Sequence, residues 1–331
     1  MKVLFVGGTG LISQAVSKLA VEKGIELYLF NRGRNKEFVP EGAEVITGDI
    51  RDIQSSKEVL RDYHFDAVVD WIVFTPEQAR ADIEIFNDIT DQYIFISSAS
   101  AYQKPPTDYL ITESTPLANP YWQYSRDKIA CEKLFMDEYR ENAFPVTIVR
   151  PSHTYGNTMI PAVLNSEEYP WSLLDRMQKG KKIIVHGDGT SLWTMTHNTD
   201  FAKGFTGLLG NMKSIGHSFH ITSDEVLNWN QIYQTIGRAL GVEPDLVHIS
   251  SDFIVSQFPE KEGSLLGDKA ISCVFDNSKI KRFVPEYKAT VSFAEGIRQT
   301  IEWFRANPNR CKVDQEWNKK MDKLIELYEN K

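Results

Sequence analysis

Hydrophobic and polar residues follow each other along the first 150 positions in a pattern that predicts strands alternating with helices. Short apolar runs predict buried strands at residues 2–7, 26–30, 44–47, 66–72, 92–97 and 146–150. Apolar residues at helical spacing predict helices at residues 11–23, 55–63, 77–90 and 121–142. Strands joined by crossover helices form a parallel sheet with helices on both faces. The pattern therefore predicts an α/β fold built on a doubly wound parallel sheet.

A glycine-rich turn separates the first predicted strand from the first predicted helix. It reads Gly7-Gly8-Thr9-Gly10-Leu11-Ile12-Ser13. Glycines let the backbone approach a pyrophosphate, and a helix that starts at Leu11 and Ile12 offers free N–H groups and the positive end of its dipole. Between a strand and a helix this spacing predicts a dinucleotide site of the Rossmann type, although Ser13 occupies the place of the third glycine. A tight turn without a ligand is the alternative.

The end of the second predicted strand indicates which nicotinamide cofactor binds. A carboxylate there binds the ribose hydroxyls of NAD, whereas an arginine suits the 2′-phosphate of NADP. The chain has Asn31, Arg32 and Arg34 at this place and no acidic residue. Because a guanidinium can hold a phosphate through two hydrogen bonds, we predict that NADP(H) is favoured, with NAD(H) as the alternative. Asp49 and Ile50, after the third strand, are expected on the adenine side.

After Pro151 the pattern loosens, and we expect a second lobe. Helices are predicted at 171–179, 200–212 and 229–240 and from Val313 onward, a strand at 217–222, and a polar loop at 258–271. We assign residues 1–157, which residues 200–223 are expected to rejoin, to an NAD(P)-binding Rossmann domain. Residues 158–199 and 224–331 are assigned to a smaller, mixed α/β substrate-binding lobe.

Tyr124 and Lys128 are four residues apart on a predicted helix, so their side chains lie on one face, about one turn apart. An ammonium group near a phenol favours the phenolate, and so allows a group with an ordinary pKa of ~10 to exchange protons near neutral pH. Alone, this spacing is common and fits a packed tyrosine beside a solvated lysine. Ser98 lies nearby, at the carboxyl end of a predicted strand, where ligands bind in open parallel sheets.

Several stretches together resemble the extended short-chain dehydrogenase/reductase enzymes of the NAD-dependent epimerase/dehydratase superfamily. In the first half these are Gly7-x-x-Gly10, Gly48-Asp49-Ile50, Ser97-Ser98-Ala99-Ser100-Ala101-Tyr102, Thr112-Glu113-x-x-Pro116, Tyr124-x-x-x-Lys128, Arg150-Pro151 and Tyr155-Gly156. The second half matches more loosely, at His186-Gly187-Asp188-Gly189 and His197-x-x-Asp200. The resemblance implies a catalytic set of Ser98, Tyr124 and Lys128, with Tyr124 and Lys128 also contacting the cofactor. It also implies a homodimer through helices 77–90 and 121–142.

Departures from the family pattern concern the substrate. Trp193 stands where sugar-nucleotide members carry a diphosphate-binding arginine, and His153 stands where an asparagine is common. Ala99-Ser100 replaces the Asp-Glu pair of the dehydratases, and Trp71 follows the fourth strand in place of a small residue. These differences disfavour a dehydratase and weaken a nucleotide-sugar epimerase. We expect a small-molecule substrate, a sugar or sugar nucleotide, held against Ser98 and the residues Trp71, His153 and Trp193. Lys179, Lys181 and Lys182 are alternative phosphate ligands.

Composition narrows the function classes. With 37 basic and 45 acidic residues the chain carries a net charge of −8, which disfavours nucleic acid as a partner. No apolar run reaches membrane-spanning length, and the first strand starts at Lys2, where a signal peptide would lie. The cysteines Cys131, Cys273 and Cys311 lie far apart, as reduced thiols of a cytoplasmic protein do. No histidine set has metal-ligand spacing, so we expect no metal.

The sequence thus predicts an NAD(P)-dependent oxidoreductase or epimerase that acts on a carbonyl or hydroxyl carbon by hydride transfer. Two alternatives stay open. One is a nucleotide-sugar epimerase. The other is a non-catalytic protein of the same fold, which senses NADP or binds RNA, because the Phe30-Asn31-Arg32-Gly33 turn also resembles the chloroplast stem-loop RNA-binding proteins.

Overall fold

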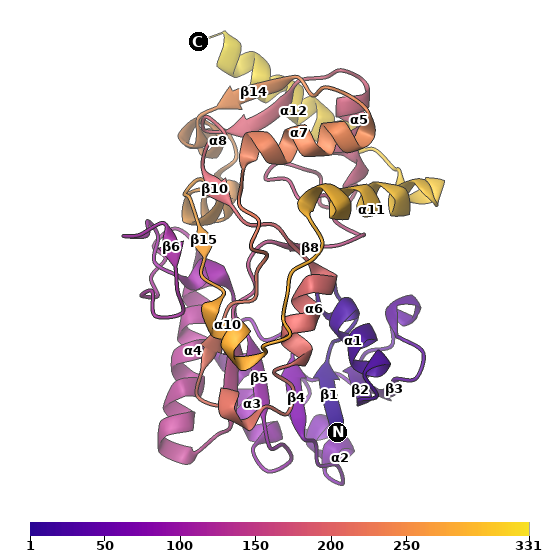
Figure 1. Ribbon diagram of the computed structural model, residues 1–331, viewed down its shortest axis with the longest axis vertical. Helices are drawn as coiled ribbons and strands as arrows, with labels where there is room; N and C mark the ends of the chain where they lie inside the picture. The colour runs from indigo at the N-terminus through magenta and orange to yellow at the C-terminus, as the bar shows by residue number, and fades with distance from the viewer. Residues whose placement is uncertain (331) are drawn as a thin grey trace.

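Seven parallel strands form the central sheet of the computed structural model, which describes residues 1–330 (Figure 1). Their order across the sheet is β3-β2-β1-β4-β5-β7-β12, and each neighbouring pair is parallel. The strands are β1 (Lys2–Val6), β2 (Glu26–Asn31), β3 (Glu44–Thr47), β4 (Ala67–Asp70), β5 (Tyr93–Ile96), β7 (Val146–Val149) and β12 (Ser218–Phe219). The prediction of a doubly wound parallel sheet is confirmed, and a strand within 217–222 pairs with β7 at the edge of the sheet.

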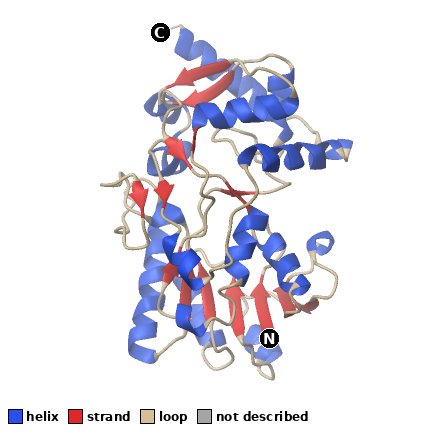
Figure 2. Ribbon diagram, in the orientation of Figure 1, coloured by secondary structure: helices blue, strands red, loops and turns tan. Residues whose placement is uncertain are grey.

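Helices cover both faces of the sheet (Figure 2). On one face, α1 (Ser13–Glu22) and α6 (Asn198–Thr206) pack together and share a hydrophobic cluster with β1, β2 and β4. On the other face, α2 (Ile53–Leu60), α3 (Pro76–Phe86) and α4 (Gln123–Asn142) supply the second cluster. Burial of apolar side chains on both faces explains why the strands read as continuous hydrophobic runs.

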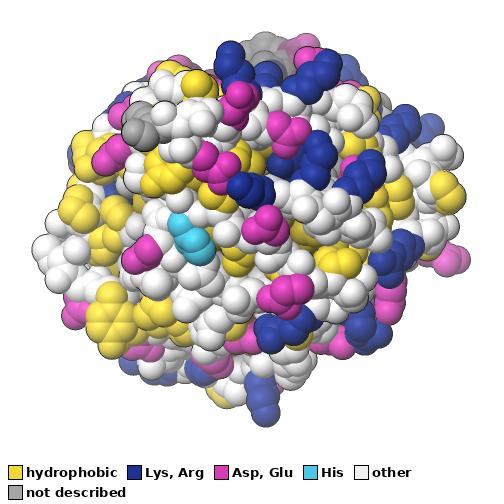
Figure 3. Space-filling view, turned by 90° about the horizontal axis from the view of Figure 1, so that it is seen from above, with side chains coloured by type: hydrophobic (Ala, Val, Ile, Leu, Met, Phe, Trp, Pro, Cys, Tyr) yellow, Lys and Arg dark blue, Asp and Glu magenta, His cyan; other side chains and the backbone are white. Residues whose placement is uncertain are grey.

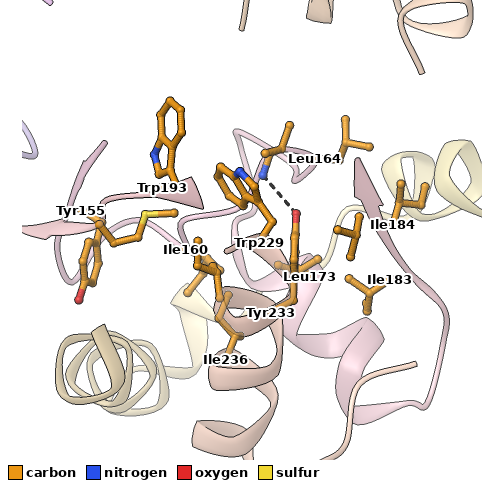
Figure 4. Packing of buried hydrophobic residues seen from close by; sticks show 14 of the residues in the cluster. Tyr155, Ile160, Leu164, Leu173, Ile183, Ile184, Trp193, Trp229, Tyr233 and Ile236 are labelled. Carbon is orange, nitrogen blue, oxygen red and sulfur yellow. Dashed lines mark hydrogen bonds between the residues drawn. The ribbon is translucent and has the colours of Figure 1, made fainter. Parts of the chain in front are cut away.

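The second lobe, at the top of Figure 1, has its own hydrophobic core. Figure 4 shows this core, in which Trp193, Trp229 and Tyr233 pack among aliphatic side chains and the Tyr233 hydroxyl accepts a hydrogen bond from the Val163 N–H at 3.3 Å. Asn228 caps α7 through reciprocal bonds with Gln231. The main elements are α5 (Trp171–Gln178), β9 (Ile183–His186), α7 (Trp229–Leu240), β14 (Leu246–Ile249), α8 (Ser251–Gln257), α11 (Phe293–Arg305) and α12 (Gln315–Glu329). Helix α10 (Ser278–Phe283) packs instead on the sheet, where Ile280 joins the cluster of α1 and α6.

Two short strand pairs connect the two lobes. They are β6 (Leu110–Ile111) with β15 (Val274–Phe275), and β8 (Thr154–Tyr155) with β11 (Thr196–His197). The segments that follow Tyr109 and Pro151 thereby lie beside residues more than forty positions away in the chain. A third pair, β10 (Leu192–Trp193) with β13 (Leu227–Asn228), lies within the second lobe. Across residues 1–330, none of the helices combines the length and the hydrophobicity that a membrane crossing requires.

Several local predictions were wrong. The helices predicted at 77–90 and 200–212 end at Phe86 and Thr206. Helix α1 begins at Ser13 instead of residue 11, because the Ser13 hydroxyl accepts the Gly10 N–H at 2.8 Å and the turn ends there. The segment 258–271, predicted as a polar loop, is helical over η4 (Pro259–Lys261), α9 (Glu262–Ser264) and the π-helix η5 (Leu265–Lys269).

Tertiary contacts fix the π-helix η5. The side chain of Leu265 is fully buried, the Asn119 amide donates to the Gly267 carbonyl at 2.7 Å, and the Trp229 indole donates to the Lys269 carbonyl at 3.2 Å. These partners lie far from the segment in sequence. Local periodicity therefore could not indicate this helix.

Candidate active site

A large cleft of about 740 Å³ opens at the carboxyl ends of the sheet strands. Every residue predicted to bind the cofactor lines it, from Gly7 at the end of β1 to Lys128 on α4. Ser98 and Trp71 line it as well. The parallel strands bring these residues together because their carboxyl ends meet at one edge of the sheet.

The glycine turn forms the floor of the large cleft with a backbone that only glycine adopts easily. Gly7 and Gly8 have φ angles of 96° and 80°. A Cβ atom on Gly8 would lie 2.6 Å from Cδ2 of Leu29, so the Leu29 side chain would have to move to admit it. The Ser17 hydroxyl donates to the Gly8 carbonyl at 2.8 Å and fixes the turn. This cradle fits the close approach of a pyrophosphate.

At the end of β2 the large cleft presents two arginines. The Asn31 side chain accepts the Gly33 N–H at 2.7 Å and shapes the turn that carries Arg32 and Arg34. Both arginines line the cleft and are exposed, and neither guanidinium has a hydrogen-bond or ion-pair partner among the described residues. Both are therefore available to an anionic ligand. Asp49 lies across the cleft and accepts the Arg51 N–H at 3.1 Å.

A small cavity of about 280 Å³ lies beside the large cleft and shares Ser98 and Tyr124 with it. Ser98 precedes the short helix η2 (Ala99–Ala101), where its hydroxyl accepts the Ser100 N–H at 3.2 Å. Burial raises the pKa of the Tyr124 phenol and the charge of Asp268 raises it further, whereas a hydrogen bond with Ser98 lowers it. The phenol is thus a proton donor at neutral pH.

Lys128 is buried beneath Tyr124. Its ammonium group donates to the Ile96 carbonyl at 2.7 Å and to the Val73 carbonyl, and it lies 5.7 Å from the centre of the Tyr124 ring. Burial lowers the pKa of Lys128 to about 8. We expected Lys128 to favour the Tyr124 phenolate. In the structure its charge is directed at backbone carbonyls, and burial dominates the pKa of the phenol.

A buried ion pair positions the helix that carries Tyr124 and Lys128. Arg150, at the end of β7, donates to both carboxylate oxygens of Glu132 on α4, at 2.9 and 2.6 Å. The Ser97 hydroxyl donates to the same carboxylate at 2.5 Å. The Arg-Pro motif at 150–151 thus ties α4 to β5 and β7, and a bidentate pair of this kind fixes orientation.

The residues predicted to contact substrate lie in three different places. His153 lines the small cavity, where burial lowers its pKa to about 3 and its Nδ1 atom has no hydrogen-bond partner within residues 1–330. Trp71 lines the large cleft and packs against Phe205, with ring centres 5.0 Å apart. Trp193 is 1% exposed and stacks behind the small cavity, 5.8 Å from the ring of Trp229, so it lines neither space.

The three lysines considered as alternative phosphate ligands are occupied elsewhere. Lys179 pairs with Asp175 and Lys181 with Asp322, both at 2.8 Å, and Lys182 pairs with Glu329. Figure 3 shows this end of the molecule from above, where basic and acidic side chains are interspersed. These lysines belong to the outer surface around α5 and α12, and none lines the large cleft or the small cavity.

Sequence reasoning missed two charged residues of the small cavity, Asp268 and Lys269. Both come from the π-helix η5, which was predicted as a loop. A third missed residue, Lys104, lies behind them and is 4% exposed. A polar segment without periodicity carried no signal for this placement, because only the packing of η5 on Trp229 and Asn119 brings it to the cavity.

Comparison with known proteins agrees with this geometry. The family model described as "NAD dependent epimerase/dehydratase family" matches residues 3–87 and 80–222. The 2'-dehydrokanamycin reductase of Streptomyces kanamyceticus is 23% identical over 87% of this chain and 80% of its own. The chloroplast stem-loop binding protein of 41 kDa b of Arabidopsis thaliana is 26% identical over 75% of this chain and 65% of its own.

Among solved structures, the dTDP-glucose 4,6-dehydratase of Bacillus anthracis in complex with NAD superposes with a TM-score of 0.75. It is 18% identical, and the match covers 93% of this chain and 98% of that one. This likeness shows the fold, and the family model shows the family, since it covers well over half of the chain. The chain belongs to the NAD dependent epimerase/dehydratase family and is an NAD(P)-dependent enzyme of the extended short-chain dehydrogenase/reductase type.

Proposed function

We propose that this enzyme is an NADP(H)-linked oxidoreductase that moves hydride to or from a carbonyl or hydroxyl carbon in the small cavity. One observation carries the proposal. Ser98 and Tyr124, together with Pro151 and Ser152, form the wall that the large cleft and the small cavity share. A dinucleotide in the cleft and a substrate in the cavity would therefore meet at the two hydroxyl groups.

The proposed roles follow from the proton balance of carbonyl reduction. A nicotinamide bound in the large cleft would supply hydride to the carbonyl carbon, and the carbonyl oxygen would then have to gain a proton. Tyr124 donates that proton, since burial and Asp268 keep its phenol protonated, and Ser98 holds the same oxygen by a hydrogen bond. Lys128, one helical turn away, binds the nicotinamide ribose. In the oxidative direction Tyr124 takes the proton back.

The preference for NADP(H) over NAD(H) rests on the end of β2. Arg32 and Arg34 are exposed to the large cleft without acidic partners among residues 1–330, and no carboxylate stands at this position to bind ribose hydroxyls. A guanidinium without a partner loses little on binding a phosphate, because no existing ion pair must be broken. The 2′-phosphate of NADP(H) is the anion that this end of the cleft would receive.

A nucleotide-sugar epimerase is the alternative within the same chemistry. The similar proteins include a reductase and a dTDP-glucose dehydratase, so membership of the family does not decide which reaction this chain catalyses. Ala99 and Ser100 are both buried, and the Ser100 hydroxyl is bonded to Ser125 at 2.7 Å, so this chain has no carboxylate pair there for eliminating water. This disfavours a dehydratase, and Trp193 in place of the arginine that binds the diphosphate weakens the epimerase, so we favour a reductase.

A second candidate is a non-catalytic protein that binds RNA or senses NADP. The 26% identity to the Arabidopsis stem-loop binding protein favours it. The net charge of −8 disfavours RNA binding, because contacts with the phosphate backbone need an excess of basic residues.

We propose further that the protein is a cytoplasmic homodimer. The helices α3 and α4 pack side by side on one face of the sheet, and family resemblance implies that the same two helices of a second copy complete a four-helix contact. Sedimentation at several concentrations tests this. A monomer mass throughout would remove the dimer.

The proposed function is tested by NADPH oxidation with a panel of ketones, keto sugars and nucleotide sugars. We expect turnover of at least one carbonyl compound, with the oxidised cofactor released in each cycle. If the protein binds a structured RNA tightly and oxidises no NADPH with any member of the panel, the second candidate takes its place.

A further inference from the structure

Two oppositely charged side chains line the small cavity together with Tyr124. Asp268 and Lys269, on the π-helix η5, both line the cavity, and Oδ2 of Asp268 lies 2.8 Å from Nζ of Lys269. Their side chains are 13% and 16% exposed. A pair this deeply buried costs free energy of desolvation unless its remaining hydrogen-bonding positions are filled.

A second lysine, the buried Lys104, also contacts Asp268. Its ammonium group lies 3.5 Å from Oδ1 of Asp268, donates to the Cys273 thiol at 2.8 Å, and has a side chain only 2% exposed. Two lysines thus keep the pKa of Asp268 below its ordinary value despite burial. The carboxylate is ionised and fixed in position at neutral pH.

Asp268 and Lys269, which both line the cavity, still have free hydrogen-bonding positions. A carboxylate has about four acceptor positions and an ammonium three donors. Asp268 uses one position for each lysine, and Lys269 makes one such bond, to Asp268. The Nδ1 atom of His153, in the same cavity, has no partner within residues 1–330. The cavity therefore offers a charged acceptor and a charged donor to one small ligand, whereas the Nδ1 atom of His153 is itself buried.

We propose that Asp268 and Lys269 are specificity-determining residues that bind a hydroxyl group on the carbon next to the reacting carbon. The inference rests on the proposed function, in which the reacting oxygen lies at Ser98 and Tyr124. A hydroxyl group can donate to Asp268 and accept from Lys269 at once, so a neutral ligand leaves the ion pair intact. Tyr124 and Asp268 line the same small cavity, so one small ligand can contact both.

The same geometry disfavours a nucleoside diphosphate in the small cavity. Its volume of about 280 Å³ lies below the ~300–1,000 Å³ of sites for drug-sized ligands. The one lysine that lines it is already paired with Asp268, and a diphosphate would have to compete with that carboxylate. A single hydroxylated ring is the class of substrate that fits.

The test measures binding to the NADPH complex, in which an alcohol cannot react. We would compare cis-1,2-cyclohexanediol with cyclohexanol by ligand-detected NMR. The diol is expected to bind about tenfold to a hundredfold more tightly than the alcohol, the scale set by a hydrogen bond to a charged group. Asp268→Asn and Lys269→Met should each remove most of this ratio by weakening the diol alone. Lys261→Met is the matched control, because Lys261 pairs with Glu167 outside the cavity and the ratio should persist.

The outcomes separate this inference from the proposed function. Equal binding of diol and alcohol by the unmodified complex, or an unchanged ratio in both cavity variants, overturns the inference while NADPH binding stands. Competition between UDP and the diol at one saturable site also overturns it. Failure to bind NADPH at all would instead overturn the proposed function. A variant that fails to fold is recognised by loss of NADPH binding, and the remaining variant then decides.

Discussion

The large cleft and the small cavity are built in opposite ways. The cleft takes its shape from the backbone at the ends of consecutive strands, with Gly7 and Gly8 as its floor and Arg32 at one end. The cavity takes its shape from side chains of segments that meet only in the folded chain, among them His153 after β7 and Asp268 on η5.

This difference separates the requirements of cofactor binding from those of substrate choice. A backbone cradle binds any dinucleotide, and so depends on few residue types. The cavity depends on a buried ion pair and an unpartnered histidine, and a change of any one of them alters which ligand fits. The following predictions test whether cofactor binding and substrate chemistry can be disturbed separately.

Replacement of Tyr124 should produce the largest effect. Tyr124→Phe should lower turnover by ~10²–10⁴-fold, because the proton donor is lost, while NADPH affinity stays nearly unchanged. Tyr139→Phe is the control, since Tyr139 lies on the same helix and is 37% exposed, away from both spaces. Steady-state rates and a fluorescence titration measure the two quantities. Full activity of Tyr124→Phe would refute its proposed role.

Replacement of Arg32 should affect the cofactor side alone. Arg32→Ala should weaken NADPH binding by ~1–3 kcal/mol, the contribution of a hydrogen bond to a charged group, and leave NADH binding as it was. Titration with both cofactors measures the difference. Equal affinities of the unmodified protein for NADPH and NADH would contradict the NADP preference.

His153 should make stability depend on pH. Its pKa is about 3 in the folded protein against 6.5 for the free side chain, so the unfolded chain binds more protons between these values and the free energy of unfolding falls as the pH drops through this window. Between pH 6.5 and about pH 5 the loss should be ~1–2 kcal/mol. His153→Gln should show a shallower fall than the parent, measured by urea unfolding across this range. Parallel curves for the two proteins would show that His153 does not cause the fall.

Replacement of Lys182 should have the smallest effect. Lys182→Met removes an exposed pair with Glu329 and should leave the free energy of unfolding nearly unchanged. Neither NADPH binding nor turnover should change, since Lys182 lines neither space. A loss of nucleotide affinity in this variant would show that a phosphate site lies on the outer surface after all.

The two regions also differ in how far the sequence could predict them. The strand–turn–helix pattern and the Tyr124–Lys128 spacing are local, so the sheet and the residues of the large cleft could be anticipated. The cavity residues Asp268 and Lys269 could not, because long-range contacts to Trp229 and Asn119 hold η5 in place. Trp193 was predicted to contact the substrate from its place in the family pattern. In the structure it is buried and does not line the cavity.

The central proposal is that cofactor and substrate meet at Ser98 and Tyr124. Its most direct test is a crystal structure of the complex with NADP⁺. The account predicts that the pyrophosphate lies on the Gly7–Gly10 turn, the 2′-phosphate at Arg32, and the nicotinamide between Ser98 and Tyr124 with its reactive face toward the small cavity. A cofactor bound outside the large cleft, or one whose nicotinamide points away from Tyr124, would contradict it.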